Sequence, residues 1–201
     1  MQKNILIFLW LIAATGCARE KKTPPAETEF QREINAKFKD AEQSPLKEKD
    51  RENFQGLDFF PFDDTYVVTA DFKRTPDEKA FGMKTTTTRL PVYVKYGELS
   101  FTLKGKPYKL NVYQNQDLIK KEEYADYLFL PFLDDTNGNS TYGGGRYIDM
   151  RIPQGNTMVI DFNTAYNPYC AYNEKYSCPI IPRENYMAEK IEAGVKAYQN
   201  H

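Results

Sequence analysis

Histidine is almost missing from this 201-residue chain, whose single His is the last residue. That scarcity argues against histidine-based catalysis and against a metal site built from several imidazoles. The formal net charge is only −1, so the chain offers no basic surface for nucleic acid or for an anionic membrane. No internal repeat, nucleophile elbow or phosphate-binding glycine spacing is present. We therefore expect no metal, no cofactor and no nucleic acid to bind.

Long apolar runs are also lacking, and the longest one covers only residues 5–14. A helix of this length spans about half of a ~30 Å bilayer core, and with Lys3 before it the run is typical of a signal peptide, residues 1–16. Residues 14–17 (Ala-Thr-Gly-Cys) resemble a bacterial lipobox. This motif predicts that Cys17 carries acyl chains such as palmitate and anchors the protein in a membrane of the cell envelope. The alternative is a secreted protein with a coincidental cysteine.

The segment after the leader carries charges and prolines with little to bury, so residues 17–29 are predicted to be a disordered tether. Phe30, Ile34 and Phe38 then recur at i, i+4 and i+8, which predicts an amphipathic helix that ends before Pro45. We expect this helix to dock on the domain core rather than to lie on the membrane.

From Tyr66 onward the apolar pattern changes to a period of two, which is typical of strands. Short turns separate the runs, so we expect an antiparallel arrangement. Residues 184–198 have helical spacing and are predicted to form a closing helix. The sequence predicts one mainly β (α+β) domain, residues 30–201, built as a β-sandwich or barrel of about 7–8 strands with a helix at each end. The predicted strands include residues 66–73, 85–88, 92–96, 99–103, 108–112, 127–132, 145–152 and 158–163.

Two cysteines, Cys170 and Cys178, enclose a short tyrosine-rich loop. In an exported protein such a pair is predicted to form a disulfide, worth roughly 2–3 kcal/mol for a loop of this size. Two free thiols are the alternative.

Residues 134–139 (Asp-Asp-Thr-Asn-Gly-Asn) place oxygen ligands at alternate positions, as a calcium loop does. The twelfth position is Gly145 instead of the required Glu, so we interpret the segment as a tight turn. The three glycines at residues 143–145 are predicted to let two backbones approach closely rather than to admit a ligand.

Arg146 and Asp161 lie in two predicted strands joined by a turn at residues 153–156, so we expect them to face each other. Three interpretations follow: a structural hydrogen-bonded cluster, a pocket in which Arg146 binds an anion, or a catalytic site. The catalytic version uses Asp149 or Asp161 as base and Tyr142 or Tyr166 as acid. The candidate ligand-binding residues are Asp134, Thr136, Tyr142, Arg146, Asp161, Asn163, Tyr166 and Asn167.

The stretches LFLPFLDDTNGNSTYGGGRYIDM (residues 128–150) and DFNTAYNPYCAYNEKYSCPIIPRENY (residues 161–186) resemble the bacterial family known as domain of unknown function 1684. The resemblance extends over roughly residues 30–198 and implies no established activity. It marks as signature positions Asp134, Thr136, Tyr142, Gly145, Arg146, Asp161, Asn163, Tyr166, Asn167, Cys170, Cys178, Glu184 and Asn185.

These observations predict a lipid-anchored cell-envelope protein whose domain is a non-catalytic binding or structural module. Its expected partners are the membrane, through the anchor on Cys17, and a small polar or anionic ligand. The alternative is an envelope hydrolase or transferase that uses Asp and Tyr as acid and base.

Overall fold

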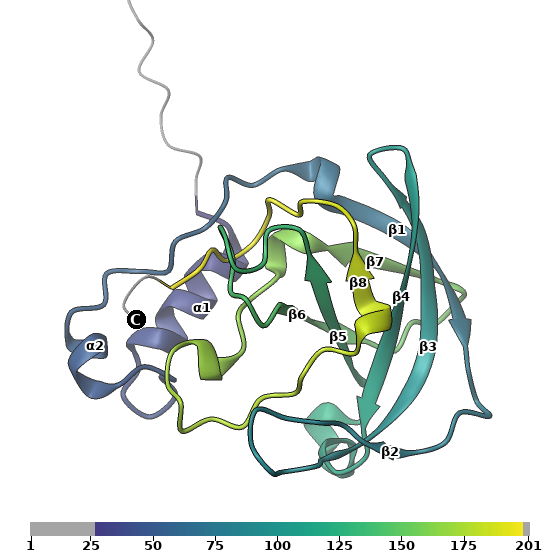
Figure 1. Cartoon of the computed structure of the whole chain (residues 1–201), viewed down its shortest axis with the longest axis horizontal. Coiled ribbons are helices and arrows are strands. Elements are labelled where there is room, and N and C mark those ends of the chain that lie inside the picture. Colours follow the sequence, from purple (N-terminus) through teal and green to yellow (C-terminus); the bar gives the residue numbers. More distant parts are fainter. Residues whose placement is uncertain (1–26, 199–201) are drawn as a thin grey trace, which may run out of the picture.

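The computed structural model describes residues 27–198 (Figure 1). The predicted leader, Cys17 and all but the end of the tether lie outside these residues. The helices are α1 (Glu29–Lys39) and α2 (Glu48–Glu52). The strands are β1 (Val67–Arg74), β2 (Phe81–Gly82), β3 (Val92–Leu103), β4 (Lys106–Asn115), β5 (Tyr127–Asp134), β6 (Arg146–Arg151), β7 (Thr157–Asp161) and β8 (Tyr186–Met187). Short 3-10 turns are η1 (Asp64–Tyr66), η2 (Leu118–Lys120), η3 (Glu122–Tyr124), η4 (Phe162–Thr164), η5 (Tyr169–Ala171) and η6 (Arg183–Asn185).

One sheet contains all the strands in the order β6-β5-β4-β3-β1-β7, with β2 added beside β3 and β8 beside β5. Each pair along this path is antiparallel, and only the short β5–β8 pairing is parallel. Strands β6 and β7 stand at the two ends of the path, yet only residues 152–156 connect them. Five residues reach at most about 18 Å, so the sheet must curl until its ends come close. The domain is therefore mainly antiparallel β, built on a curled half barrel rather than on two packed sheets.

The hairpin that we predicted between residues 145–152 and 158–163 is wrong. β6 pairs with β5, where Arg146 faces Phe132, and β7 pairs with β1, where Asp161 faces Val67. The two ends of the connecting turn bond to different parts of the sheet: the Ile152 N–H donates to the carbonyl of Asp126, just before β5, and the Phe72 N–H in β1 donates to the Asn156 carbonyl. A short turn between two strands thus joins the two edges of a curled sheet instead of making a hairpin.

Helix α1 begins with a capping box in which Thr28 and Gln31 bond each other's backbone N–H groups. Its apolar stripe packs in a cluster that contains Phe38, Leu46 and Tyr172. Figure 1 shows α1 and α2 together on one side of the curled sheet. No helix within residues 27–198 is long and apolar enough to cross a membrane.

The predicted closing helix at residues 184–198 is absent, and the segment instead contains η6, β8 and irregular chain. Its apolar residues follow a helical spacing, but Gly194 adopts φ +76° and interrupts any helix. The backbone bonds to other elements, with the Val195 N–H donating to the Ala165 carbonyl and the Lys196 N–H to that of Asp58. This segment runs from β8 toward the helices across one end of the curled sheet (Figure 1).

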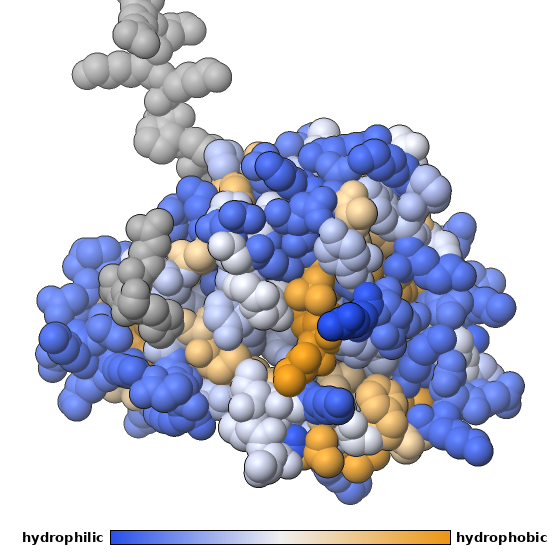
Figure 2. All heavy atoms as spheres, viewed as in Figure 1, coloured by the Kyte–Doolittle hydropathy of each residue, from blue (hydrophilic) through white to orange (hydrophobic). Residues whose placement is uncertain are grey.

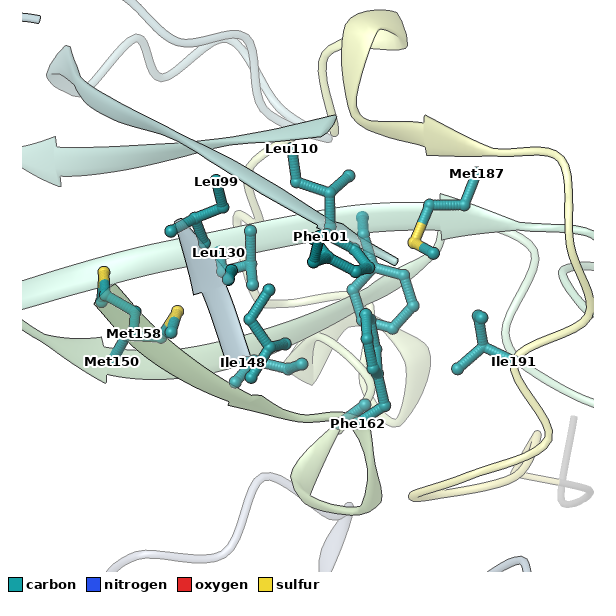
Figure 3. Packing of buried hydrophobic residues seen from close by; sticks show 14 of the residues in the cluster. Leu99, Phe101, Leu110, Leu130, Ile148, Met150, Met158, Phe162, Met187 and Ile191 are labelled. Carbon is teal, nitrogen blue, oxygen red and sulfur yellow. The ribbon is translucent and has the colours of Figure 1, made fainter. Parts of the chain in front are cut away.

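The main core fills the inside of the curl. Side chains from the sheet and from the C-terminal segment converge there, among them Leu99, Phe101, Leu130, Phe162, Met187 and Ile191 (Figure 3). A separate cluster that includes Tyr93, Tyr113, Phe129 and Tyr147 covers part of the outer face. Because both faces of β5 are covered, its strand is buried almost throughout. Outside, the face seen in Figure 2 is mostly hydrophilic, with hydrophobic residues gathered in a strip near its middle.

Candidate functional site

Arg146, the first residue of β6, points into the protein. Its Nη2 donates to Asp134 Oδ2 at 2.9 Å and to the Ile191 carbonyl at 2.7 Å, while Nη1 donates to the Ala193 carbonyl. Neither the Arg146 nor the Asp134 side chain has any exposed surface. Burial lowers the pKa of Arg146, although the charge of Asp134 opposes that shift. Arg146 therefore fixes the C-terminal segment to the sheet and is sealed from an external anion.

Asp161 does not pair with Arg146, because their strands stand at opposite ends of the strand path. Asp161 Oδ1 accepts hydrogen bonds from the backbone N–H and from Nδ2 of Asn163, both at 2.9 Å. The Asn163 amide also bonds both backbone groups of Asp63, at 2.9 and 3.1 Å. This pair ties the end of β7 to the chain before β1, which is a structural role.

The remaining candidates are spread over separate places. Thr136 donates its backbone N–H to Asp134 Oδ1 at 2.8 Å and shares a hydroxyl contact with Thr141 at 2.7 Å, so the segment forms the turn we expected. Asn167 is buried and donates to the Lys196 carbonyl at 2.8 Å. The eight candidates do not form one pocket.

Two signature positions that the resemblance marked explain how strands β4, β5 and β6 are held. Gly145 has φ +84°, and a Cβ there would lie 2.7 Å from the Phe132 carbonyl oxygen. The buried amide of Asn185 accepts from the Asn111 N–H at 2.9 Å and donates to the Asn111 and Pro131 carbonyls at 2.8 and 2.6 Å. Pro131 in β5 has no N–H for a ladder, so the Asn185 side chain substitutes for the missing strand pairing.

Cys170 and Cys178 are free thiols in this structure, and the disulfide between them stays a prediction. The Cys170 backbone N–H donates to Cys178 Sγ at 3.1 Å, and the Tyr142 hydroxyl lies 3.8 Å from Cys170 Sγ. A hydrogen bond from Cys178 lowers the pKa of Cys170 to about 6, and the same contact raises that of Cys178. The short spacing correctly predicted that Cys170 and Cys178 lie close together, and in this structure the two residues are joined by hydrogen bonds.

Tyr166 makes the contact that defines a different site. Its hydroxyl donates to Asp149 Oδ1 at 2.6 Å, and the Tyr127 hydroxyl donates to the same oxygen at 2.7 Å. Asp149 Oδ2 has no hydrogen bond, and Asp149 has no ion pair, with any residue that the structure describes. Asp149 is exposed, so its carboxylate can reach a ligand.

This carboxylate lies in a cleft of about 630 Å³ that we call the Asp149 cleft. It is lined by one face of α1, by Tyr147 and Asp149 of β6 and by the segment 164–179. Its walls are largely aromatic: Tyr147 meets Tyr166 edge to face at 6.0 Å, and Tyr169 meets Tyr176 at 5.3 Å. Largely apolar walls with few polar groups are typical of small-molecule sites, and the volume lies within their ~300–1,000 Å³ range.

The tyrosines that hold Asp149 are poor acids. Burial, followed by the nearby charge of Asp149, raises the pKa of Tyr127 and that of Tyr166 well above the ordinary value. A general acid works best with a pKa near the operating pH, so these phenols are suited to donating hydrogen bonds rather than protons. No group of three or more metal-binding side chains exists within residues 27–198. The arrangement is chemically equipped for binding.

Sequence reasoning found Tyr166, and named Asp149 only as a possible base, but missed Tyr127 and the contribution of α1. One signal was available for Tyr127. In the β5–β6 register Phe129 faces Asp149, so Tyr127 lies diagonally from Asp149 on the neighbouring strand. The contribution of α1 depends on how the helix docks, which no local pattern encodes.

A curled antiparallel half barrel, closed at one end by a C-terminal segment and bearing an aromatic cleft beside its N-terminal helix, defines the class of domain. The model of the family described as "Protein of unknown function (DUF1684)" matches residues 52–196, and the chain belongs to this family. No curated protein matches the sequence.

One solved structure is similar along most of its length. It is the solution NMR structure of an uncharacterized protein from Haloarcula marismortui, with 31% sequence identity and a TM-score of 0.67. The match covers 85% of this chain and 92% of the other. It supports the curled, mainly antiparallel fold.

Proposed function

We propose that this protein is a bacterial lipoprotein, anchored in the cell envelope through acyl chains on Cys17, whose domain binds a small polar organic ligand in the Asp149 cleft. The lipobox-like sequence at residues 14–17, after a short apolar run, supports the anchor. Helix α1, one wall of the cleft, follows the predicted tether directly, so the anchor would hold the cleft close to the membrane.

The observation that carries the binding function is the unpaired carboxylate of Asp149. Two tyrosine hydroxyls fix one of its oxygens, and the other faces no described partner. A charged group held in one orientation beside aromatic walls is prepared to recognise a complementary ligand. A purely structural carboxylate would instead be enclosed and paired, as Asp134 is.

The alternative of an envelope hydrolase or transferase has less support. It requires a tyrosine acid beside an aspartate base, and Tyr166 with Asp149 meets that requirement geometrically. The raised pKa of Tyr166 keeps its proton in place near neutral pH, which favours binding over proton transfer.

Cell fractionation tests the anchor. Wild-type protein should sediment with membranes, and a Cys17→Ala variant should not acquire acyl chains. If the Cys17→Ala variant carries the same acyl mass on intact-protein mass spectrometry, or if the wild type carries none, the lipoprotein proposal is wrong.

Ligand-detected NMR tests the cleft. Small aromatic fragments that are neutral, positively charged or negatively charged should include binders to the wild-type protein. Tyr176→Ala removes one ring of the cleft wall and should weaken those binders, whereas Tyr186→Ala removes an exposed tyrosine outside the cleft and should not. Equal binding by all three proteins, or no binding by the wild type, contradicts the proposal.

A further inference from the structure

The geometry of the Asp149 cleft favours a positively charged ligand. We infer that its ligand is an organic cation, an ammonium or quaternary ammonium group joined to an apolar portion of about the size of one ring. This inference rests on the proposed binding function and specifies its ligand class.

The first step is the charge of Asp149. The phenols of Tyr127 and Tyr166 are neutral, so they satisfy the lone pairs of Oδ1 without neutralising the carboxylate. No lysine or arginine within residues 27–198 pairs with it, unlike Asp126, which pairs with Arg151 at 2.7 Å. A carboxylate beside largely buried rings is less well hydrated than one on an open surface, so a cation that reaches Oδ2 gains more than it would in bulk water.

The second step concerns the aromatic rings that line the cleft. The ammonium of Lys37 lies 5.4 Å from the ring centre of Tyr169, and that of Lys175 lies 5.0 Å from that of Tyr176. Both rings belong to the cleft. The protein therefore already places ammonium groups over these rings, an interaction in which the negative face of an aromatic ring attracts a cation. Tyr147 and Tyr166 offer further rings nearer to Asp149.

The third step compares the possible ions. Anions are disfavoured beside Asp149, because this carboxylate has no ion pair with any described residue, whereas the ammonium groups of Lys37 and Lys175 lie over the rings of Tyr169 and Tyr176. A bare metal ion is disfavoured, because the described residues hold no group of three or more metal-binding side chains. A carboxylate with aromatic neighbours and a roomy apolar cleft fits a polyatomic cation with a hydrophobic part.

Calorimetric titration of the full-length protein, purified in a non-ionic detergent, tests the inference with three small probes. They are benzyltrimethylammonium, benzyl alcohol and 3-phenylpropionate, which share a ring and differ in charge. We expect the ammonium probe to bind about tenfold more tightly than the alcohol, a factor within the range for one partly screened ion pair. Added salt should lower the affinity for the ammonium probe and leave the affinity for the alcohol unchanged.

The decisive variant is Asp149→Asn, which removes the charge and keeps an oxygen acceptor for the tyrosine hydroxyls. We expect it to reduce the affinity for the ammonium probe to that for the alcohol, with an unchanged melting temperature. Asp135→Asn is the matched control, since Asp135 also accepts a tyrosine hydroxyl, from Tyr186, but lies outside the cleft. That variant should bind like the wild type.

Each contrary result has a distinct meaning. If all three probes bind alike, without dependence on salt or on Asp149, the inferred charge preference is wrong while the binding function stands. If none of the probes binds, and the neutral and charged fragments of the preceding experiment fail as well, both are wrong. If the Asp149→Asn variant unfolds, its affinities cannot be used, and the effect of salt on the wild-type affinities decides instead. If salt changes the affinity for the ammonium probe no more than the affinity for the alcohol, the inference is overturned.

Discussion

Asp134 and Arg146 form an ion pair of 2.9 Å in which neither side chain is exposed to solvent. The pair holds the segment that crosses one end of the half barrel, because Arg146 also donates to two of its carbonyls and Asp134 accepts from the Ile191 N–H. Burying two charges carries a large desolvation cost, so we interpret the pair as fixing the path of the segment rather than as adding net stability. Arg146, which the sequence suggested as an anion-binding residue, is thus a structural brace that holds the C-terminal segment on the sheet.

Replacing one partner of this brace should be costly. Arg146→Met leaves Asp134 buried without its cation, and we expect the free energy of unfolding to fall by about 3–5 kcal/mol in urea denaturation. Arg151→Met is the control, because Arg151 is in an exposed pair with Asp126 and should change stability by less than about 1 kcal/mol. Similar losses for the two variants would show that Arg146 is no brace.

The buried amide of Asn185 makes an equally specific prediction. Asn185→Ala removes the partners of the Asn111 N–H and of the Pro131 carbonyl, and each orphaned buried group costs about 1–3 kcal/mol. Asn139→Ala, in an exposed turn position, should be nearly neutral. Thermal unfolding of the two variants checks this, and a stable Asn185→Ala protein would mean that water replaces the amide.

Replacing Gly194 should destabilise the protein, because its backbone conformation suits only glycine. Its φ of +76° is unfavourable for other residues, and a Cβ there would lie 2.4 Å from the Ala165 carbonyl oxygen. We expect Gly194→Ala to lose more than about 1–2 kcal/mol of stability. Gly155→Ala should be tolerated, since nothing lies within 4 Å of its added Cβ. Equal melting temperatures for the two variants would contradict the assigned path of the C-terminal segment.

We predict that the two thiols, Cys170 and Cys178, differ in how fast they are alkylated and that the rate for Cys170 depends on pH. With a pKa of about 6 instead of the ordinary 9.0, Cys170 is a thiolate above pH 6, so its alkylation rate should rise between about pH 5 and 7 and then level off. Cys178, whose pKa is raised, should react slowly across this range.

The control for this prediction is Cys178→Ala, which removes the hydrogen bond that lowers the pKa of Cys170. The rate profile of Cys170 should then move toward higher pH. Mass spectrometry after alkylation without reductant measures both sites. A protein in which neither cysteine reacts until it is reduced would restore the disulfide and overturn the free-thiol assignment.

Local patterns predicted much of the fold. The period of two correctly identified β1, β4, β5, β6 and β7, and the i, i+4, i+8 spacing of Phe30, Ile34 and Phe38 predicted the helix that became α1. The two strands predicted at residues 92–96 and 99–103 are one strand, β3, which continues through a bulge at Gly97, and the strand predicted at residues 85–88 does not form. The same spacing at Met187, Ile191 and Val195 predicted a helix that does not form. There the apolar residues are buried from an irregular stretch of chain, and Gly194 with the segment's tertiary backbone bonds overrides the periodicity.

The site was less predictable, because it depends on contacts between distant segments. Arg146 and Asp161 seemed to be neighbours because a short turn, predicted at residues 153–156, separates their strands, yet only the curl of the sheet decides which edges meet. Tyr166 reaches Asp149 because an isolated bridge pairs its backbone with that of Tyr147. The sequence contains all of these residues, but their grouping follows from the tertiary path.

The measurement that tests the central claim most directly is a residue-resolved NMR titration of the protein with benzyltrimethylammonium. We predict that the resonances which shift most belong to Tyr147, Asp149, Tyr166 and the facing side of α1, and that the Asp149→Asn variant loses these shifts. Shifts confined to another surface, such as the hollow beside Lys104 and Tyr66, or equal shifts in the variant, would contradict the account.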